Sequence, residues 1–275
     1  MKKVLILTGV LLLLAVVAAA CGGQATPTLA PAAKAPAAPK APAATKAPTA
    51  APQLVGDPIR GGKLYDNWVK ETGVEAPKGD QALWKTQSTN KRTGVDTWRC
   101  KECHGWDYKG RDGAYGKGSH MTGFVGVLQA AGKAPAEILA ALKGSTNPDH
   151  NFSAVMDDQA LTDLALFISQ EVRDVAPILA LAGQADNGKT LYQDNCINCH
   201  GPKALAINFG NDAAPEYPAT LANSNPTELL SKLRFGQPAV PDMPSGIDNG
   251  WKDQDYADMA AYLKTLPTES AVVEG

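Results

Sequence analysis

Two short cysteine motifs constrain this chain more than any other feature. Residues 100–104 read CKECH and residues 196–200 read CINCH, so a histidine directly follows each pair of cysteines. The chain has five cysteines in 275 residues, and the fifth, Cys21, lies near the N-terminus. Four cysteines outside the cytoplasm could form two disulfides, and a C-x-x-C pair could bind zinc or act as a redox dithiol. None of these uses accounts for a histidine after both pairs.

Covalent attachment of haem accounts for the histidine as well as for the cysteines. In that arrangement each cysteine forms a thioether bond with the haem, and the adjacent histidine becomes an axial ligand of the iron. The sequence therefore predicts two covalently bound haem c groups. The predicted attachment cysteines and proximal histidines are Cys100, Cys103 and His104 for the first haem, and Cys196, Cys199 and His200 for the second.

The segments around both motifs resemble the class I c-type cytochromes, in two tandem copies. NGKTLYQDNCINCHG is similar to the entry helix of that family, and DYADMAAYLKTLP is similar to its closing helix. The resemblance covers most of residues 55–267 and implies an all-α fold, with each small domain wrapped around one haem. We therefore expect cytochrome c domains at residues 55–176 and 177–275, the first with an insertion before its haem motif.

The sequence also repeats outside the haem motifs. APAEILAALKG at 134–144 matches NPTELLSKLRFG at 225–236, and MDDQALTDLALFI at 156–168 matches WKDQDYADMAAYL at 251–263. In the first pair a proline stands near the start, a glutamate follows it, and a glycine ends the segment, as at the two ends of a helix. In the second pair the apolar residues recur at helical spacing. The repeat predicts four helices, two in each copy.

An insertion distinguishes the first copy from the second. Tyr192 lies four residues before Cys196, whereas Tyr65 lies 35 residues before Cys100. The intervening residues 69–99 contain glycine, proline, asparagine and lysine, which favour loop over helix. The insertion could cover a haem edge, dock a partner or be a solvated loop, and the sequence leaves these open.

The second axial ligand of the C-terminal haem has two candidates, Met243 and Met259. A second protein ligand on the haem iron favours electron transfer, whereas an open position on the iron favours binding of an external molecule or catalysis. Met243 lies in the loop VPDMPSG, before Pro244, where the family that the chain resembles keeps its distal methionine. Met259 lies on the apolar face of the closing helix, which is typical of a core residue. We predict Met243 as the ligand.

The N-terminal haem has more candidates, and the repeat ranks them. PDH at 148–150 aligns with PDM at 241–243, so His150 stands where the other copy has Met243. Met156 aligns with Trp251 and is interpreted as a packing residue before a helix capped by Asp157. We predict His150 as the ligand. The alternatives, left open by the sequence, are Met156, His120, Met121 and an open site, and His120 is interpreted as a loop histidine near a haem propionate.

The N-terminus predicts export and membrane attachment. Two lysines precede an apolar run at 4–20 that ends in small residues before Cys21, as in a secretory signal. The junction resembles a bacterial lipobox, although Ala18 stands where leucine is preferred. It implies a signal peptide at 1–20 and a lipid on Cys21. The alternative is an uncleaved anchor helix.

The Ala- and Pro-rich segment 21–54 offers little apolar surface to bury and is predicted to be an extended tether.

The charge balance argues against nucleic acid as a partner. All 28 acidic residues but only 21 of the 26 lysines and arginines follow residue 53, which gives this part a formal charge of −7.

We expect a di-haem cytochrome tethered at the extracytoplasmic face of a bacterial membrane, carrying single electrons between redox proteins of a respiratory or photosynthetic chain. The alternatives are an enzyme like the di-haem peroxidases or thiosulfate dehydrogenases, and a fixed subunit of a larger complex. No catalytic residue is predicted, and no cysteine remains as the distal ligand typical of thiosulfate enzymes.

Overall fold

The computed structural model describes residues 54–269, and its regular secondary structure there is helical. The predicted signal peptide, the lipid site Cys21 and nearly all of the tether lie outside these residues. Within them no strand forms, only isolated β-bridges, and no helix is long and apolar enough to cross a bilayer. The all-α prediction is confirmed for the described residues. The α-helices are α1 Pro58–Thr72, α2 Cys100–His104, α3 Pro135–Leu142, α4 Asp158–Gln170, α5 Ala176–Leu179, α6 Ala185–Asn195, α7 Ile197–His200, α8 Pro218–Ser224, α9 Pro226–Phe235 and α10 Asp253–Leu263.

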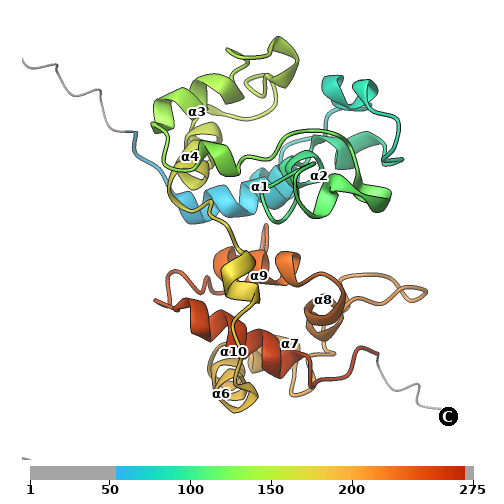
Figure 1. Cartoon of the computed structure of the whole chain (residues 1–275), viewed down its shortest axis with the longest axis vertical. Coiled ribbons are helices and arrows are strands. Elements are labelled where there is room, and N and C mark those ends of the chain that lie inside the picture. The colour runs from blue at the N-terminus through green and yellow to red at the C-terminus, as the bar shows by residue number, and fades with distance from the viewer. Residues whose placement is uncertain (1–53, 270–275) are drawn as a thin grey trace, which may run out of the picture. The chain divides into compact units, whose positions relative to one another are not determined.

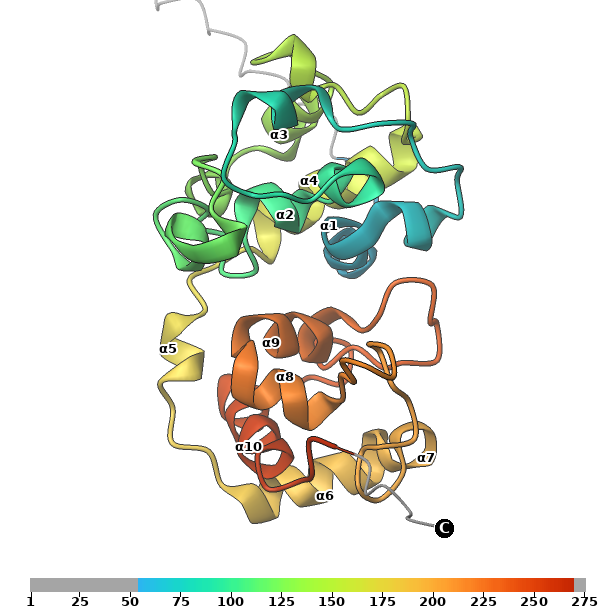
Figure 2. The ribbon, with the colours of Figure 1, turned by 90° about the vertical axis from the view of Figure 1, so that its right-hand side faces the viewer.

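The helices gather in two groups, which Figures 1 and 2 show with α5 in the connection between them. We call residues 54–175 the N-terminal group and residues 176–269 the C-terminal group. In the N-terminal group α1 packs against α4, and in the C-terminal group α6 packs against α10. All described residues nevertheless fall within one compact unit. The predicted domain boundary at residue 176 therefore stays a prediction.

Each of these helix pairs crosses at a glycine. A Cβ atom on Gly61 of α1 would lie 2.2 Å from the carbonyl oxygen of Asp163 in α4. A Cβ atom on Gly188 of α6 would lie 2.0 Å from the carbonyl oxygen of Asp258 in α10. Since only glycine has no Cβ, only glycine permits either approach. The two groups therefore have the same close helix crossing.

The side chains of the same two aspartates also bind the backbone just before the first helix of each pair, α1 or α6. The Asp163 carboxylate accepts a hydrogen bond of 2.8 Å from the Asp57 backbone N–H, and Asp258 accepts one of 2.7 Å from that of Gln184. Both aspartates are buried, and a buried carboxylate needs such partners. The repeat that the sequence shows is thus also a repeat of contacts.

The predicted helices begin where their sequences indicate. Helices α3 and α9 start at Pro135 and Pro226, because proline at the first position gives up no hydrogen bond. The Asp157 carboxylate caps α4 by accepting from the Ala160 N–H at 2.7 Å, as predicted. The insertion is less simple: α1 continues through residues 69–72, and the rest is loop with two 3₁₀ turns, Ala82–Thr86 and Gly94–Trp98.

The two groups touch through aromatic packing and buried charge. Phe167 of α4 and Phe235 of α9 meet edge to face, with ring centroids 5.2 Å apart. Arg234, also on α9, donates at 2.9 Å to the carbonyl oxygen and at 3.2 Å to the carboxylate of Glu171. Arg234 is nearly fully buried, so this contact closes the N-terminal group against α9.

Asp66 of α1 is a second buried charge in this contact. Its carboxylate binds the Arg99 guanidinium at 2.7 Å and the Lys232 ammonium of α9. The side chain is only 4% exposed. Burial alone would raise the pKa of Asp66, but the charges of Lys232 and Arg99 outweigh it and hold this pKa below its ordinary value. Asp66 therefore stays ionised and links the two groups.

Candidate haem sites

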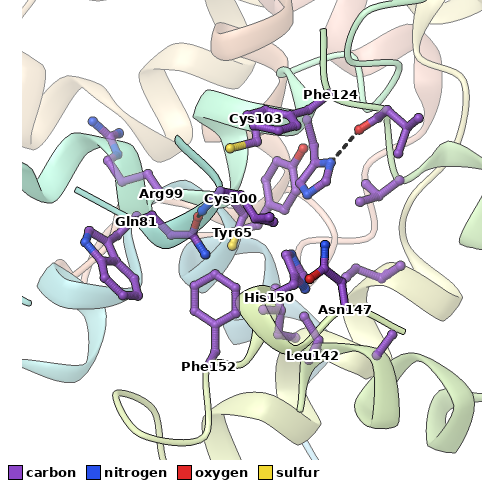
Figure 3. Close-up of a pocket in the computed structure, with 18 of the residues that line it drawn as sticks. Tyr65, Gln81, Arg99, Cys100, Cys103, Phe124, Leu142, Asn147, His150 and Phe152 are labelled. Atoms are coloured by element: carbon purple, nitrogen blue, oxygen red, sulfur yellow. Dashed lines mark hydrogen bonds between the residues drawn. The ribbon is translucent and has the colours of Figure 1, made fainter. Parts of the chain in front are cut away.

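The first motif opens into a cavity of about 560 Å³ in the N-terminal group. Figure 3 shows Cys100, Cys103, His150 and Phe152 around a common space. His104 lines the same cavity, and most of the remaining wall is apolar. The insertion supplies part of the wall too, through Gln81, Leu83, Thr86, Thr97, Trp98 and Arg99. The insertion therefore forms part of the wall of this cavity, and its covering a haem edge stays a prediction.

His104 and His150 face one another across the cavity. Their ring centroids are 6.1 Å apart and the ring planes are inclined by 77°. A metal–imidazole bond is about 2 Å long, so two imidazoles on opposite sides of one metal have centroids roughly 6 Å apart. The spacing of these two rings fits a shared iron. This is a fit of the residues present, and the ligand assignment itself stays a prediction.

The tautomer of His104 suits a metal ligand. Its Nδ1 lies 2.6 Å from the carbonyl oxygen of Val125. A carbonyl oxygen only accepts, so Nδ1 carries the proton and Nε2 keeps a free lone pair. Burial lowers the pKa of His104 to about 4, with a smaller contribution from His150. The ring is therefore neutral at pH 7, as a metal ligand must be.

The cysteines of the first motif do not resemble a reactive dithiol. Burial raises the pKa of Cys100 and Cys103 to about 12. Reactive cysteines have a lowered pKa in electropositive surroundings, the opposite of what is found here. Neither cysteine is in a disulfide, and the described part of the chain has no cluster of His, Cys, Asp or Glu suited to a bare metal ion.

The alternative ligands for the N-terminal site lie elsewhere. Met156 is 4% exposed among the core residues and does not line the cavity. His120 stacks on Tyr115 with ring centroids 4.8 Å apart, and the Arg92 guanidinium lies 3.0 Å from its Nδ1. Neither His120 nor Met121 lines the cavity. Of the four candidates named from the sequence, His150 shares the cavity with His104.

The second motif opens into a smaller cavity of about 230 Å³ in the C-terminal group. Cys196, His200, Met243 and Met259 all line it, while Cys199 is exposed and does not. Burial lowers the pKa of His200, so this ring is also neutral at pH 7. The buried Nδ1 of His200 has no hydrogen-bond partner among residues 54–269. Met259 is fully buried in α10, as expected of a core residue, whereas Met243 is partly exposed.

One tyrosine locks each motif in the same way. The hydroxyl of Tyr65 donates at 2.7 Å to the carbonyl oxygen of Gly105, the residue after CKECH. The hydroxyl of Tyr192 donates at 2.6 Å to the carbonyl oxygen of Gly201, the residue after CINCH. The two tyrosines are the pair that the repeat aligned, despite the insertion beside Tyr65. The local frame around the two histidines is therefore the same.

Sequence reasoning missed the charged pair inside the first motif. Lys101 and Glu102 are buried and form an ion pair, and Arg92 from the insertion lies 3.3 Å from Glu102. The signal was present: CKECH holds two charged residues between its cysteines, and CINCH holds none. Sequence reasoning also missed Arg99, which lines both cavities.

Both cavities thus combine cysteine sulfur with a neutral histidine nitrogen, which suits a covalently attached haem. The wall of the first is mostly apolar, and the wall of the second mixes apolar residues with charged ones such as Glu228 and Lys232. Residues 183–263 match the family model for the cytochrome c oxidase, cbb3-type, subunit III. The chain is 33% identical over 92 residues to a "Cytochrome c-553-like" protein of Synechocystis sp., a match that covers 34% of this chain and 78% of that relative. No solved structure matches the chain.

These likenesses agree with the geometry of the sites. A c-type cytochrome holds haem c covalently and exchanges electrons with redox partners. From the motifs, the cavities and the relative together, the chain belongs to the c-type cytochromes and is an electron-transfer protein.

Proposed function

We propose that this protein is a membrane-tethered, extracytoplasmic di-haem cytochrome that carries single electrons between redox proteins of a respiratory or photosynthetic chain. The observation that carries the proposal is that each CxxCH motif opens into its own cavity with a second candidate ligand on its wall. The repeated contacts of Tyr65 and Tyr192 support two tandem cytochrome domains. Bound haem would supply one-electron exchange at iron, and the chain supplies ligands, burial and docking surface.

His104 and His150 would hold the N-terminal haem, and His200 and Met243 the C-terminal one. The thioether of Met243 favours reduced iron more than an imidazole does. The hydrogen bond from His104 to Val125 makes that imidazole more basic, which favours oxidised iron. His200 has no such bond within the described residues. Both differences give the N-terminal site the lower potential, so electrons would run from the N-terminal to the C-terminal site.

The contact between the two groups supports transfer within one chain. Arg99 directly precedes Cys100 and lines both cavities. Its guanidinium is held by Asp66, which also binds Lys232 on the wall of the second cavity. These buried charges connect the wall of the first cavity to the wall of the second. Docking of external partners is then needed only for entry and exit of the electron.

Haem counting and electron paramagnetic resonance test the proposal. Mass spectrometry of the purified chain should give two covalent haem adducts, and the double variants Cys100→Ala/Cys103→Ala and Cys196→Ala/Cys199→Ala should each retain one. A low-temperature spectrum of the oxidised protein should contain a bis-histidine signal that His150→Ala removes. A single haem per chain would contradict the di-haem proposal, and an unchanged spectrum would reject His150 as a ligand.

The membrane tether is a separate part of the proposal and rests on the sequence of residues 1–54. Mass spectrometry should find Cys21 as the lipidated N-terminal residue. Cys21→Ser should move the holoprotein from the membrane fraction to the soluble fraction without loss of haem. Retention of that variant in the membrane would instead favour an uncleaved anchor helix.

A fixed subunit of a larger complex is the second candidate. The family model matched by residues 183–263 is named for a subunit of the cbb3-type cytochrome c oxidase. Native electrophoresis of mildly solubilised membranes separates the two cases. A mobile carrier runs alone because electron-transfer contacts are small and transient. Comigration with haem-copper oxidase activity would favour the subunit.

A further inference from the structure

We propose that Gln81, in the insertion, is the positioning residue that holds His150 on the iron. The proposal rests on the function proposed above, in which His150 is the second ligand of the N-terminal haem. Gln81 Nε2 donates a hydrogen bond of 2.7 Å to the carbonyl oxygen of Asp149, the residue directly before His150. The bond joins residues 68 positions apart in the sequence. It ties the middle of the insertion to the loop that carries His150, residues 147–152, which we call the ligand loop.

The peptide bond between Asp149 and His150 is held on both sides. Its carbonyl accepts from Gln81, and its N–H, which belongs to His150, donates at 2.9 Å to the carbonyl oxygen of Asn147. The Asn147 side chain in turn accepts from the Asp149 N–H at 3.0 Å. The backbone that carries the His150 imidazole therefore has few ways to turn without breaking a hydrogen bond.

Gln81 is itself fixed and shielded from water. Its backbone N–H donates at 2.9 Å to the Thr97 hydroxyl, and its Oε1 accepts at 2.6 Å from the Leu83 N–H. Gln81 is 6% exposed and Thr97 is 1% exposed. The bond from Gln81 to Asp149 is part-buried, with its donor inside and Asp149 at the surface, so its loss removes one net hydrogen bond from the loop of His150. Gln81 is therefore a rigid support, in contrast to a mobile surface side chain.

The other side of the ligand loop is packed by aromatic rings. Phe152 lies edge to face against His150 at 5.1 Å between centroids, and Trp98, from the end of the insertion, lies edge to face against Phe152 at 6.1 Å. The insertion thus meets the ligand loop at two places, one polar and one apolar. Of the two, the hydrogen bond from Gln81 fixes direction as well as distance.

The C-terminal group has no insertion before its motif, and the loop before Met243 is held at Ala239, whose N–H donates at 2.9 Å to the Glu71 carboxylate. The Met243 N–H donates at 3.2 Å to the carbonyl oxygen of Val240. The contact at Ala239 lies four residues before Met243, whereas Gln81 reaches the peptide directly before His150. The side-chain hydrogen bond from the insertion is therefore nearer to the candidate ligand in the N-terminal site than in the C-terminal site.

The test compares Gln81→Met with Gln87→Met in the full holoprotein. Gln87 lies in the same insertion, and within residues 54–269 its side chain has only local partners, Thr89 and Asn90, so its replacement controls for general loosening of the loop. With carbon monoxide as the probe, Gln81→Met should raise the binding rate of the reduced N-terminal haem by up to about tenfold, as expected for losing one part-buried hydrogen bond. Its bis-histidine resonance signal should broaden or split. Gln87→Met should leave both unchanged.

His150→Ala and Gln81→Glu complete the experiment. Gln81→Glu keeps the acceptor for Leu83 and removes the donor to Asp149, so it should act like Gln81→Met if that variant folds poorly. If His150→Ala changes both readouts and the Gln81 variants change neither, the role of Gln81 is overturned while the ligand assignment stands. If His150→Ala itself changes nothing, the ligand assignment is wrong and the role of Gln81 falls with it.

Discussion

The N-terminal and C-terminal groups share a helix frame and differ at the histidine ring. In both, a tyrosine hydroxyl binds the glycine carbonyl after the haem motif, at Gly105 and at Gly201. The Nδ1 of His104 has a carbonyl partner at 2.6 Å, whereas the buried Nδ1 of His200 has no partner within residues 54–269. The frame is thus repeated, and the surroundings of the motif histidine are not.

This difference shows which parts of the fold can vary. The frame depends on close crossings such as Gly61 against Asp163, where any side chain larger than glycine would collide with the facing backbone. Loops at the cavity meet no such limit, so the first group contains an insertion that forms part of the wall of its cavity. The properties that distinguish the two sites therefore come from loops supported by an unchanged helix pair.

The largest effect is expected from separating the two groups at Asp66. Asp66→Ala leaves the Arg99 and Lys232 charges in a buried contact without their counter-ion. Removing one partner of a buried ion pair costs about 3–5 kcal/mol. The free energy of unfolding, measured by denaturant titration, should fall by that amount.

Asp96 provides the matched control for Asp66. It pairs with the same Arg99 at 3.5 Å, but its side chain is 48% exposed. Asp96→Ala should therefore cost less than about 1 kcal/mol. Equal losses for the two variants would show that Asp66 does not link the groups.

A ligand exchange should remove the main chemical difference between the sites. Met243→His gives the C-terminal site two histidines, and imidazole favours oxidised iron relative to a thioether. The higher of the two midpoint potentials should fall by more than about 60 mV, a tenfold change for a one-electron couple. Potentiometric titration followed by optical spectroscopy measures this shift. Met259→Leu is the control, because Met259 is a packing residue, and a shift of equal size there would reject Met243 as the ligand.

The shared frame predicts equal losses at the two tyrosines. Tyr65→Phe and Tyr192→Phe each remove one hydroxyl donor from a carbonyl that keeps a backbone partner, at Gly105 and Gly201. Each loss should cost about 1 kcal/mol. Thermal unfolding of the two variants should show matching decreases. A clear loss at one tyrosine and none at the other would mean that the two frames are not equivalent.

The smallest effect is a dependence of stability on pH. Despite burial, Lys232 and Arg99 hold the pKa of Asp66 below the ordinary value of 3.8. The native state thus binds this proton less readily than the unfolded chain, so the stability is present above pH 3.8 and is lost as the pH falls below it. Unfolding titrations between pH 3 and 6 should show a steeper acid loss for the wild type than for Asp66→Asn. Parallel curves would remove Asp66 from the acid response.

The sequence by itself determined the haem motifs, the helix starts and the pairing of the two copies. These features are local: two residues between cysteines, Pro135 and Pro226 at helix starts, and Asp157 one residue before α4. The sequence repeat also aligned His150 with Met243. That either residue binds iron stays a prediction. Such signals survive in the sequence because they depend on residues only a few positions apart.

Only the tertiary structure decided what the insertion contacts and how the two cavities adjoin. The bond from Gln81 to Asp149 joins residues 68 positions apart, and the contact of Lys232 with Asp66 joins residues 166 apart. A glutamine in a loop and a lysine on a helix both read as solvated side chains in the sequence. They acquire partners because packing brings distant segments together and excludes water, which makes each polar contact between them costly to lose.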